Sequence, residues 1–182
     1  MKKGLVMEGG AMRCMFTAGV TDTLMKAGID FDGAIGVSAW AAFGCNYKSR
    51  QIGRVLRYNV KYASDPRLSS WQSWLKTGDL YGADFCYHDL PVKLDIFDTV
   101  AFQKNSIDFW YVATDINNGE AIYHKLILGK EANLQWIRAF SSIPVFAQPV
   151  EIGSRKYWDG GISNSIPIKF FEKLATIRTL SF

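Results

Sequence analysis

Residues 34–40 read Ala-Ile-Gly-Val-Ser-Ala-Trp, an apolar segment that runs into Ser38 with Gly36 two positions before it. This order is most of a nucleophile elbow, the sharp strand-to-helix turn that lifts a serine hydroxyl above the edge of a sheet. A complete elbow has a second glycine two positions after the serine, where this chain has Trp40. The segment predicts a strand, a turn that carries a candidate nucleophile, and a helix.

The sequence around this turn alternates between strand and helix. Gly4–Met7 is short and apolar, and apolar residues recur at helical spacing over 12–27, where Gly28 is placed to end the helix. Phe31–Val37 predicts a second strand and Ala39–Tyr47 a second helix. This βαβα order favours a parallel sheet with right-handed crossovers.

The second half of the chain continues the α/β pattern. Ile107–Thr114 and Ala121–Leu128 predict two strands, and Asn133–Phe140 and Pro167–Leu174 predict helices. No repeat and no interdomain linker is visible, so we expect a single domain over residues 1–182.

Residues 62–106 are rich in aromatic side chains and turn formers and resist assignment. On an α/β core such a segment is often a lid or one wall of an apolar pocket. The alternative is irregular surface packing, in which the aromatic rings fill gaps.

Composition narrows the class of protein. The chain has 182 residues, of which 48% are hydrophobic, and a formal net charge of +4. Three widely spaced cysteines favour a reducing, cytoplasmic setting and predict neither a disulfide framework nor a zinc site. The apolar run Leu5–Met7 is too short for a signal peptide, and no stretch is long enough to span a bilayer. We recognise no nucleic-acid-binding module and expect no nucleic-acid partner.

A serine nucleophile needs a base within hydrogen-bond reach. His88 lies in the aromatic segment and His124 in the middle of a predicted strand, so neither has the placement of a triad histidine. Asp159 is the better candidate, because Gly160 and Gly161 follow it and allow a sharp loop. The alternative is an aspartate that only hydrogen-bonds its own turn.

The Glu8–Arg13 loop contains Gly9 and Gly10 and opens a predicted helix. Backbone N–H groups at a helix start attract anions. They would suit the oxyanion of an acyl-transfer intermediate or a bound phosphate, so a phosphate- or nucleotide-binding module is a further candidate. A simple tight turn is the third possibility.

Several motifs together resemble the bacterial patatin-like phospholipases. They are Glu8-Gly-Gly-Ala-Met-Arg13, Phe16-Thr-Ala-Gly-Val20, Gly36-Val-Ser-Ala39, Phe43-Gly-Cys-Asn-Tyr-Lys-Ser49, Lys76-Thr-Gly-Asp79, Ala113-Thr-Asp115, Ser142-Ile-Pro144 and Asp159-Gly-Gly161. The resemblance extends to about Leu174 and implies a three-layer α/β/α domain with a mainly parallel central sheet.

The resemblance also implies a lipid acyl hydrolase that uses a Ser-Asp dyad and neither metal nor organic cofactor. Its substrates would be phospholipids or lysophospholipids. It assigns these roles: Ser38 as nucleophile, Asp159 as general base, Gly9, Gly10 and Ala11 as the oxyanion hole, and Gly36, Gly160 and Gly161 as motif flanks. Arg13 would hold the loop or meet a lipid phosphate; a structural ion pair is the other interpretation.

Three departures from the family pattern support an alternative, a catalytically inactive or truncated relative. Trp40 and Cys14 stand where the family has glycine, and we expect the indole to crowd the serine. After Leu174 the chain ends in Ala-Thr-Ile-Arg-Thr-Leu-Ser-Phe. One codon choice for this tail, shifted by one base, encodes a glycine turn and a buried strand, so we expect a reading-frame slip that removes the native C-terminal part.

Four basic residues are spaced to form one stripe on a predicted helix: Arg50, Arg54, Arg57 and Lys61. Such a stripe is a solvated face in most proteins. The other interpretation is peripheral contact with anionic phospholipids at the inner membrane surface.

Overall fold

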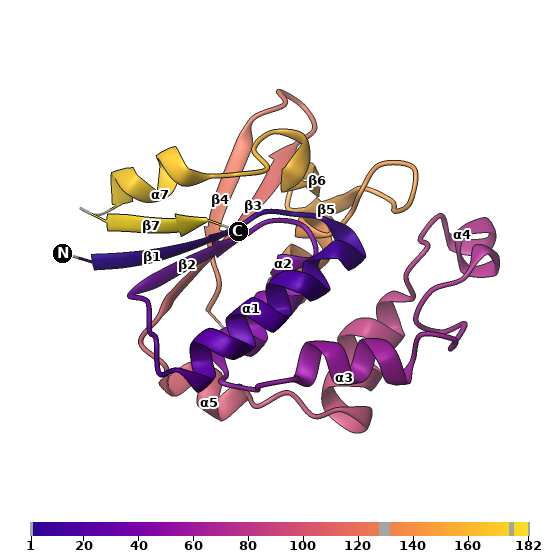
Figure 1. Ribbon diagram of the computed structural model, residues 1–182. Coiled ribbons are helices and arrows are strands. Elements are labelled where there is room, and N and C mark those ends of the chain that lie inside the picture. Colours follow the sequence, from indigo (N-terminus) through magenta and orange to yellow (C-terminus); the bar gives the residue numbers. More distant parts are fainter. Residues whose placement is uncertain (1, 128–131, 175–176, 182) are drawn as a thin grey trace.

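The structure is a computed structural model that describes residues 2–127, 132–174 and 177–181. Within them, seven strands form one sheet in the order β5-β6-β3-β2-β1-β7, and β4 also pairs with β3 (Figure 1). The strands are β1 (Lys2–Met7), β2 (Gly33–Gly36), β3 (Asp108–Asp115), β4 (Ala121–Lys125), β5 (Val150–Ile152), β6 (Arg155–Asp159) and β7 (Ile177–Ser181). Strands β7, β1, β2 and β3 pair in parallel, while β4 and β6 run antiparallel to β3 and β5 runs antiparallel to β6.

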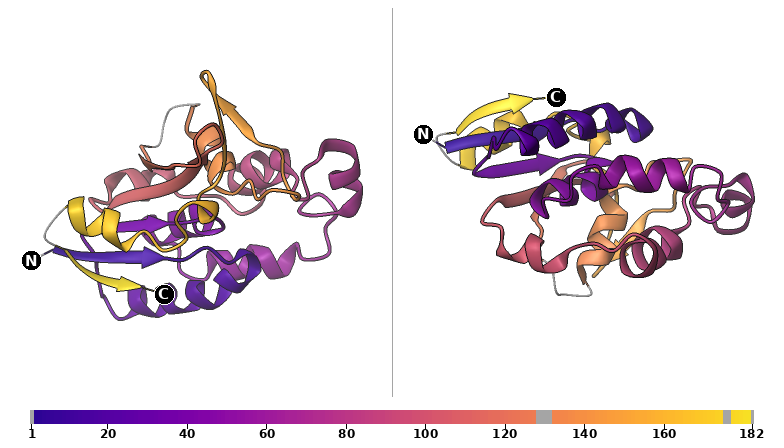
Figure 2. Two further views of the ribbon diagram at one scale, coloured as in Figure 1. Left: turned by 90° about the horizontal axis from the view of Figure 1, so that it is seen from above. Right: turned by 60° about the horizontal axis from the view of Figure 1, so that its bottom comes forward.

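Helices cover both faces of the sheet, as Figures 1 and 2 show for α1 and α7. The helices are α1 (Cys14–Lys26), α2 (Trp40–Lys48), α3 (Arg54–Lys61), α4 (Trp71–Thr77), α5 (Thr99–Lys104), α6 (Ala132–Phe140) and α7 (Ile168–Leu174). Two short 3₁₀ turns, η1 (Ala11–Arg13) and η3 (Gly160–Ile162), and a π-helix, η2 (Phe85–Leu94), complete the described elements.

The core is divided by the sheet into two parts, because alternate residues of a strand point to opposite faces. Leu5 and Met7 of β1 pack with α1 and α2 in the larger part. Val6 packs with Phe171 of α7 in the smaller part. The predicted three-layer α/β/α architecture with a mainly parallel centre is therefore confirmed.

The first βαβα unit lies where the apolar pattern places it. Helix α1 begins two residues later than the spacing suggests because residues 11–13 form a 3₁₀ turn, and it ends before Gly28, whose φ is +66°. The strands and helices predicted after residue 106 also form, although Leu128 lies outside the described residues. Strands β5 and β6 were not predicted.

The predicted basic stripe is interrupted at Arg54, which is buried, whereas Arg50, Arg57 and Lys61 are exposed. Arg50 precedes α3 with a φ of +59° and pairs with Asp30. The Arg54 side chain is only 5% exposed and pairs with Asp95, which also takes two hydrogen bonds from Arg57. The three arginines therefore bind neighbouring segments of the chain, and contact of the stripe with lipid stays a prediction.

The tail after Leu174 contributes β7, which pairs in parallel with β1 so that Lys2 lies opposite Ile177 and Val6 opposite Ser181. This pairing does not test the frame slip, which stays a prediction. Among the described residues, no helix combines the length and apolar content that a membrane crossing requires.

Candidate active site

Strand β3 brings the two candidate catalytic residues together. On the edge of β3 away from β4, Tyr111 pairs with Gly36 of β2, and Ala113 pairs with Asp159 of β6. These partner positions are two residues, or about 7 Å, apart along β3. Because β2 and β6 run in opposite directions, their C-terminal ends meet there. The chain leaves β2 through Ser38, so the serine and Asp159 reach the same place.

Ser38 occupies a strained turn between β2 and α2. Its φ is +59°, a conformation uncommon for a residue with a side chain and typical of a nucleophile elbow. Its carbonyl accepts the Ala41 N–H at 2.8 Å. A Cβ at Gly36 would lie 2.9 Å from the Trp40 carbonyl oxygen, so the turn requires glycine at that position.

Asp159 is held by its backbone while its carboxylate faces the serine. Its N–H donates to the Ser142 carbonyl at 2.9 Å, and its own carbonyl accepts the Thr114 hydroxyl at 2.7 Å. The Gly161 N–H donates to Oδ1 at 2.7 Å. Oδ2 is buried and has no hydrogen-bond partner of ordinary geometry among the described residues.

Burial raises the pKa of the Asp159 carboxyl above its ordinary value, because desolvation penalises the charged form. Two weaker effects lower it, the neighbouring Ser38 hydroxyl and the Gly161 N–H. An aspartate with a raised pKa and a free oxygen beside a serine hydroxyl is suited to accept a proton.

The glycine loop lies directly against the serine. A Cβ at Gly9 would come 2.7 Å from the Ser38 Cβ, a distance that real Cβ atoms do not adopt. Ala11 has a φ of +47°, and the N–H groups of Gly10 and Ala11 have no acceptor among the described residues. The side chain of Arg13 is exposed and does not line the pocket, so its predicted role stays a prediction.

The other predicted flanks, Gly160 and Gly161, keep the Asp159 loop close to the sheet. A Cβ at Gly160 would collide with the Val112 carbonyl of β3, and one at Gly161 would lie 3.0 Å from Asp159 Oδ1. Both positions therefore favour glycine for lack of space.

A cavity of about 160 Å³ opens beside Ser38. Residues 62–106 supply much of the cavity wall through these side chains: Leu68, Asp79, Tyr81, Ala83, Cys86, Tyr87 and Leu90. Most of the remaining lining is apolar, with Arg138 and its ion-pair partner Asp79 as the charged members. The prediction that residues 62–106 form one wall of an apolar pocket is confirmed.

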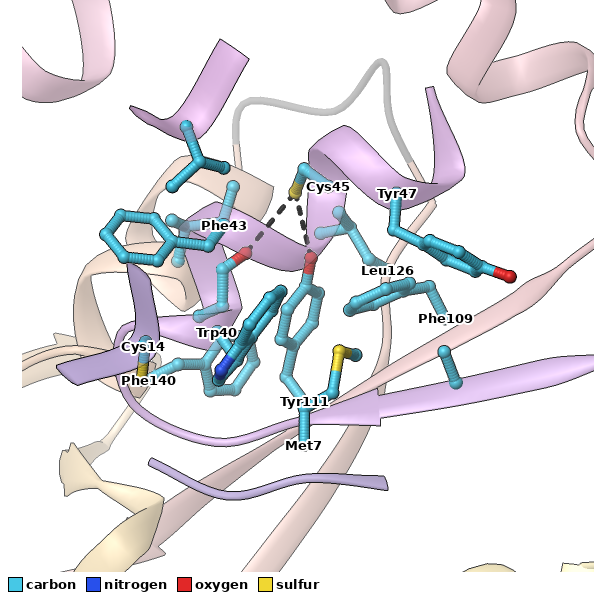
Figure 3. Packing of buried hydrophobic residues seen from close by; sticks show 14 of the residues in the cluster. Met7, Cys14, Trp40, Phe43, Cys45, Tyr47, Phe109, Tyr111, Leu126 and Phe140 are labelled. Carbon is cyan, nitrogen blue, oxygen red and sulfur yellow. Dashed lines mark hydrogen bonds between the residues drawn. The ribbon is translucent and has the colours of Figure 1, made fainter. Parts of the chain in front are cut away.

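Trp40 does not crowd the serine as expected. Its side chain is fully buried among Met7, Tyr111 and Phe140 (Figure 3), and it does not line the cavity. At the first turn of α2 the indole points toward the sheet. Cys14 is also buried, and its thiol contacts the Glu8 carbonyl at 3.7 Å. Burial raises the pKa of this thiol to about 11, so it is protonated at neutral pH.

Neither histidine belongs to the site. The His124 ring stacks on Trp136 at 4.6 Å, and burial lowers its pKa, while His88 is exposed. The predicted preference for aspartate over histidine agrees with this placement. Among the described residues, no cluster of acidic, histidine or cysteine side chains is arranged to hold a metal ion.

Two supporting residues were not singled out by the sequence analysis. The Thr114 hydroxyl contacts both the Asp159 carbonyl and the Ser163 hydroxyl, the latter at 2.8 Å. Ser142 accepts the Asp159 N–H through its carbonyl and lines the cavity. Both lie in motifs that carry the family resemblance, which was the only available signal.

A three-layer α/β/α fold with a serine elbow, a buried aspartate and a glycine loop defines the patatin-like class. The model of the family described as patatin-like phospholipase matches residues 5–171, and the chain belongs to this family of lipid acyl hydrolases. Over 172 residues the chain is 33% identical to the uncharacterized protein YjjU of Escherichia coli (strain K12). The match covers 91% of this chain and 47% of that relative, so the chain spans about half the relative's length.

Proposed function

We propose that this chain is a serine acyl hydrolase that cleaves fatty-acyl esters of phospholipids or lysophospholipids with a Ser38–Asp159 dyad. The observation that carries the proposal is the meeting of two oppositely directed strand ends on one edge of β3, which buries both residues and leaves Ser38 in the wall of an apolar cavity. The family provides the reaction class, and the cavity lining suits an acyl chain.

In the acylation step, Asp159 accepts the Ser38 proton while Oγ forms a bond to the ester carbonyl carbon. The bond from that carbon to the alcohol oxygen then breaks, and the proton passes from Asp159 to the departing alcohol. In the second step water attacks the acyl-serine and gives its proton to Asp159. The fatty acid leaves, and the proton returns to Ser38.

The oxyanion of each tetrahedral intermediate would be stabilised by the N–H groups of Gly9, Gly10 and Ala11. Two features support this assignment: the close approach of Gly9 to Ser38, and the N–H groups of Gly10 and Ala11, for which the described part of the chain offers no acceptor. One such donor contributes about 10²–10³ in rate where it has been removed from other hydrolases.

The proposal is tested by turnover of a soluble p-nitrophenyl ester and by labelling with a fluorophosphonate probe, which reacts only with an activated serine. We expect Ser38→Ala and Asp159→Asn to lose turnover and labelling. Ser141→Ala is the matched control, because this second serine lines the same cavity and should not affect labelling.

Labelling that persists in Ser38→Ala would refute the assignment of the nucleophile. An unlabelled parent chain would favour the inactive-relative alternative. If that chain were also stabilised thermally by inorganic phosphate, equally in Ser38→Ala, the glycine loop would be a phosphate site instead.

A further inference from the structure

The mouth of the cavity is bordered by large apolar side chains that are exposed. Three residues of the cavity lining, Met12, Tyr81 and Phe146, are each at least 40% exposed and mark where the cavity opens. Exposed apolar groups gathered at one opening indicate an interaction surface, whereas single ones scattered over a protein do not.

Four more exposed apolar side chains, Phe16, Trp71, Leu75 and Val145, lie in segments that line the cavity or directly adjoin such a segment in the chain, and we call them the apolar rim. They are 78%, 66%, 77% and 73% exposed. Phe16 lies in the first turn of α1, and Met12 lies in the 3₁₀ turn η1 that directly precedes this helix. The start of α1, α4 and the loop before β5 lie at the same end of the molecule in the views of Figures 1 and 2.

The rim is continuous with the cavity through the loop that carries Val145. The Trp74 indole N–H of α4 donates to the Val145 carbonyl at 2.6 Å, and the Leu80 N–H donates to the Phe146 carbonyl at 2.8 Å. Leu75 and Val145 border one shallow hollow. Helix α4 and the Val145 loop are therefore attached to the segment that supplies Phe146 to the cavity lining.

Val145 also has a strained backbone. Its φ is +74°, an outlier for a β-branched residue, and its side chain is exposed without gain in core packing. Strain of this kind is typical of functional segments. A loop that places valine here, where glycine or asparagine would relieve the strain, presents an apolar group to the surroundings.

We propose that the apolar rim inserts into a lipid–water interface and seats the cavity mouth on it. This inference rests on the proposed function, because a lipid ester can enter the cavity without crossing water only if the mouth touches the lipid surface. Insertion would bury the rim by the hydrophobic effect, with a tryptophan at the polar boundary. Arg50, Arg54 and Arg57 form ion pairs with Asp30 and Asp95, so the proposed attraction to lipid is apolar burial and not charge.

The test measures sedimentation of the Ser38→Ala chain, which does not consume lipid, with phosphatidylcholine vesicles. We expect binding that persists at high salt, since ions do not screen apolar burial. A triple variant that combines Phe16→Ser, Leu75→Ser and Val145→Ser should bind about tenfold less for each apolar group removed. Tryptophan fluorescence gives a second readout: we expect the emission of the chain to shift when vesicles are added, and Trp71→Phe should remove this shift.

A matched triple variant controls for general loss of surface hydrophobicity. It combines Val92→Ser, Ile96→Ser and Val100→Ser, which are 64%, 68% and 55% exposed. Val92 lies in η2, Ile96 between η2 and α5, and Val100 in α5, and none of the three lines the cavity. We expect its vesicle binding to stay within about twofold of the parent. Equal loss in both triple variants, no binding by the parent, or binding only to anionic vesicles at low salt would overturn the proposal.

Turnover of the soluble ester, measured with Ser38 intact, separates this proposal from the proposed function. If both hold, the rim variant keeps soluble-ester turnover and loses activity on vesicles. If the parent has no ester turnover but its vesicle binding depends on the rim, the hydrolase assignment fails and the docking surface stands. Circular dichroism of each variant confirms that it is folded.

Discussion

Replacing Trp40 by glycine, the residue that a complete nucleophile elbow has at this position, should destabilise the chain instead of freeing the candidate active site. The indole is fully buried and contacts the Phe43 ring edge-on, with centroids 6.2 Å apart. Truncating a buried tryptophan to alanine costs about 3–5 kcal/mol, and glycine in a helix adds about 0.5–1 kcal/mol.

One term opposes this loss. The Trp40 Nε1 is buried without a hydrogen-bond partner among the described residues. Removing an unsatisfied donor recovers about 1 kcal/mol. The net expected loss is about 4 kcal/mol, which is a large share of the roughly 5–15 kcal/mol that stabilises a domain. For a chain of this length it corresponds to a fall in Tm of about 8–16 °C.

The assay is urea unfolding followed by circular dichroism, with ester turnover measured on the same samples. Trp40→Phe is the control: it keeps most of the apolar volume and removes the unpaired N–H, so we expect a change below about 1.5 kcal/mol. A Trp40→Gly chain as stable as the parent would refute the packing argument. If that stable chain also gained turnover, the tryptophan would be what silences the elbow.

Four further predictions concern the site and its support. Gly9→Ala should lower kcat/KM on a soluble ester by about 10²-fold, because the new methyl group displaces the loop or the nucleophile; Gly19→Ala, which meets no atom within 4 Å, should not. The acid limb of the pH–rate profile should lie above the ordinary carboxyl range, because the base must be ionised and burial raises the pKa of Asp159; a limb at the ordinary carboxyl pKa would contradict this. Because the folded state favours the protonated Asp159 carboxyl, the parent loses stability as the pH rises through the raised pKa of this group. Asp159→Asn has no such loss, so it should be more stable than the parent at neutral pH, and the difference should shrink as the pH is lowered. Asp95→Asn should cost about 3 kcal/mol in urea unfolding by leaving the buried Arg54 guanidinium without its carboxylate; because Arg57 and Arg54 lower the pKa of Asp95, the deficit should disappear as the pH falls through that lowered pKa.

The sequence predicts the fold best where hydrophobic period and turn residues agree. The Gly4–Met7 strand and the helix that ends before Gly28 are local features, and both form. The π-helix over 85–94 could not be predicted, because its hydrogen-bond spacing leaves no recognisable apolar period and it contains Pro91. The burial of Arg54 was equally hidden, since its partner Asp95 lies 41 residues further along the chain.

Residues of the candidate site were predictable from short motifs, but their assembly was not. Ser38, Asp159 and the glycine loop each lie in a recognisable turn. What brings them together is the pairing of β6 with β3, and β6 is a short strand with no clear alternation. The expectation that the Trp40 indole crowds Ser38 was wrong for a related reason. Sequence spacing places the residue near the serine, whereas its position at the start of a helix decides toward which face the side chain points.

The pairing of β6 with β3 makes the proposed Ser38–Asp159 dyad depend on strand register. Because side chains alternate between the faces of a strand, a slip of one residue would keep a sheet but place the Trp158 indole where the carboxylate belongs. The same slip would move Asp159 into the place of Gly160. That place has no room for a side chain, because a Cβ there would collide with the Val112 carbonyl. Fluorophosphonate labelling would therefore report the register of these two strands: a chain could retain its secondary structure and its stability and still be inert.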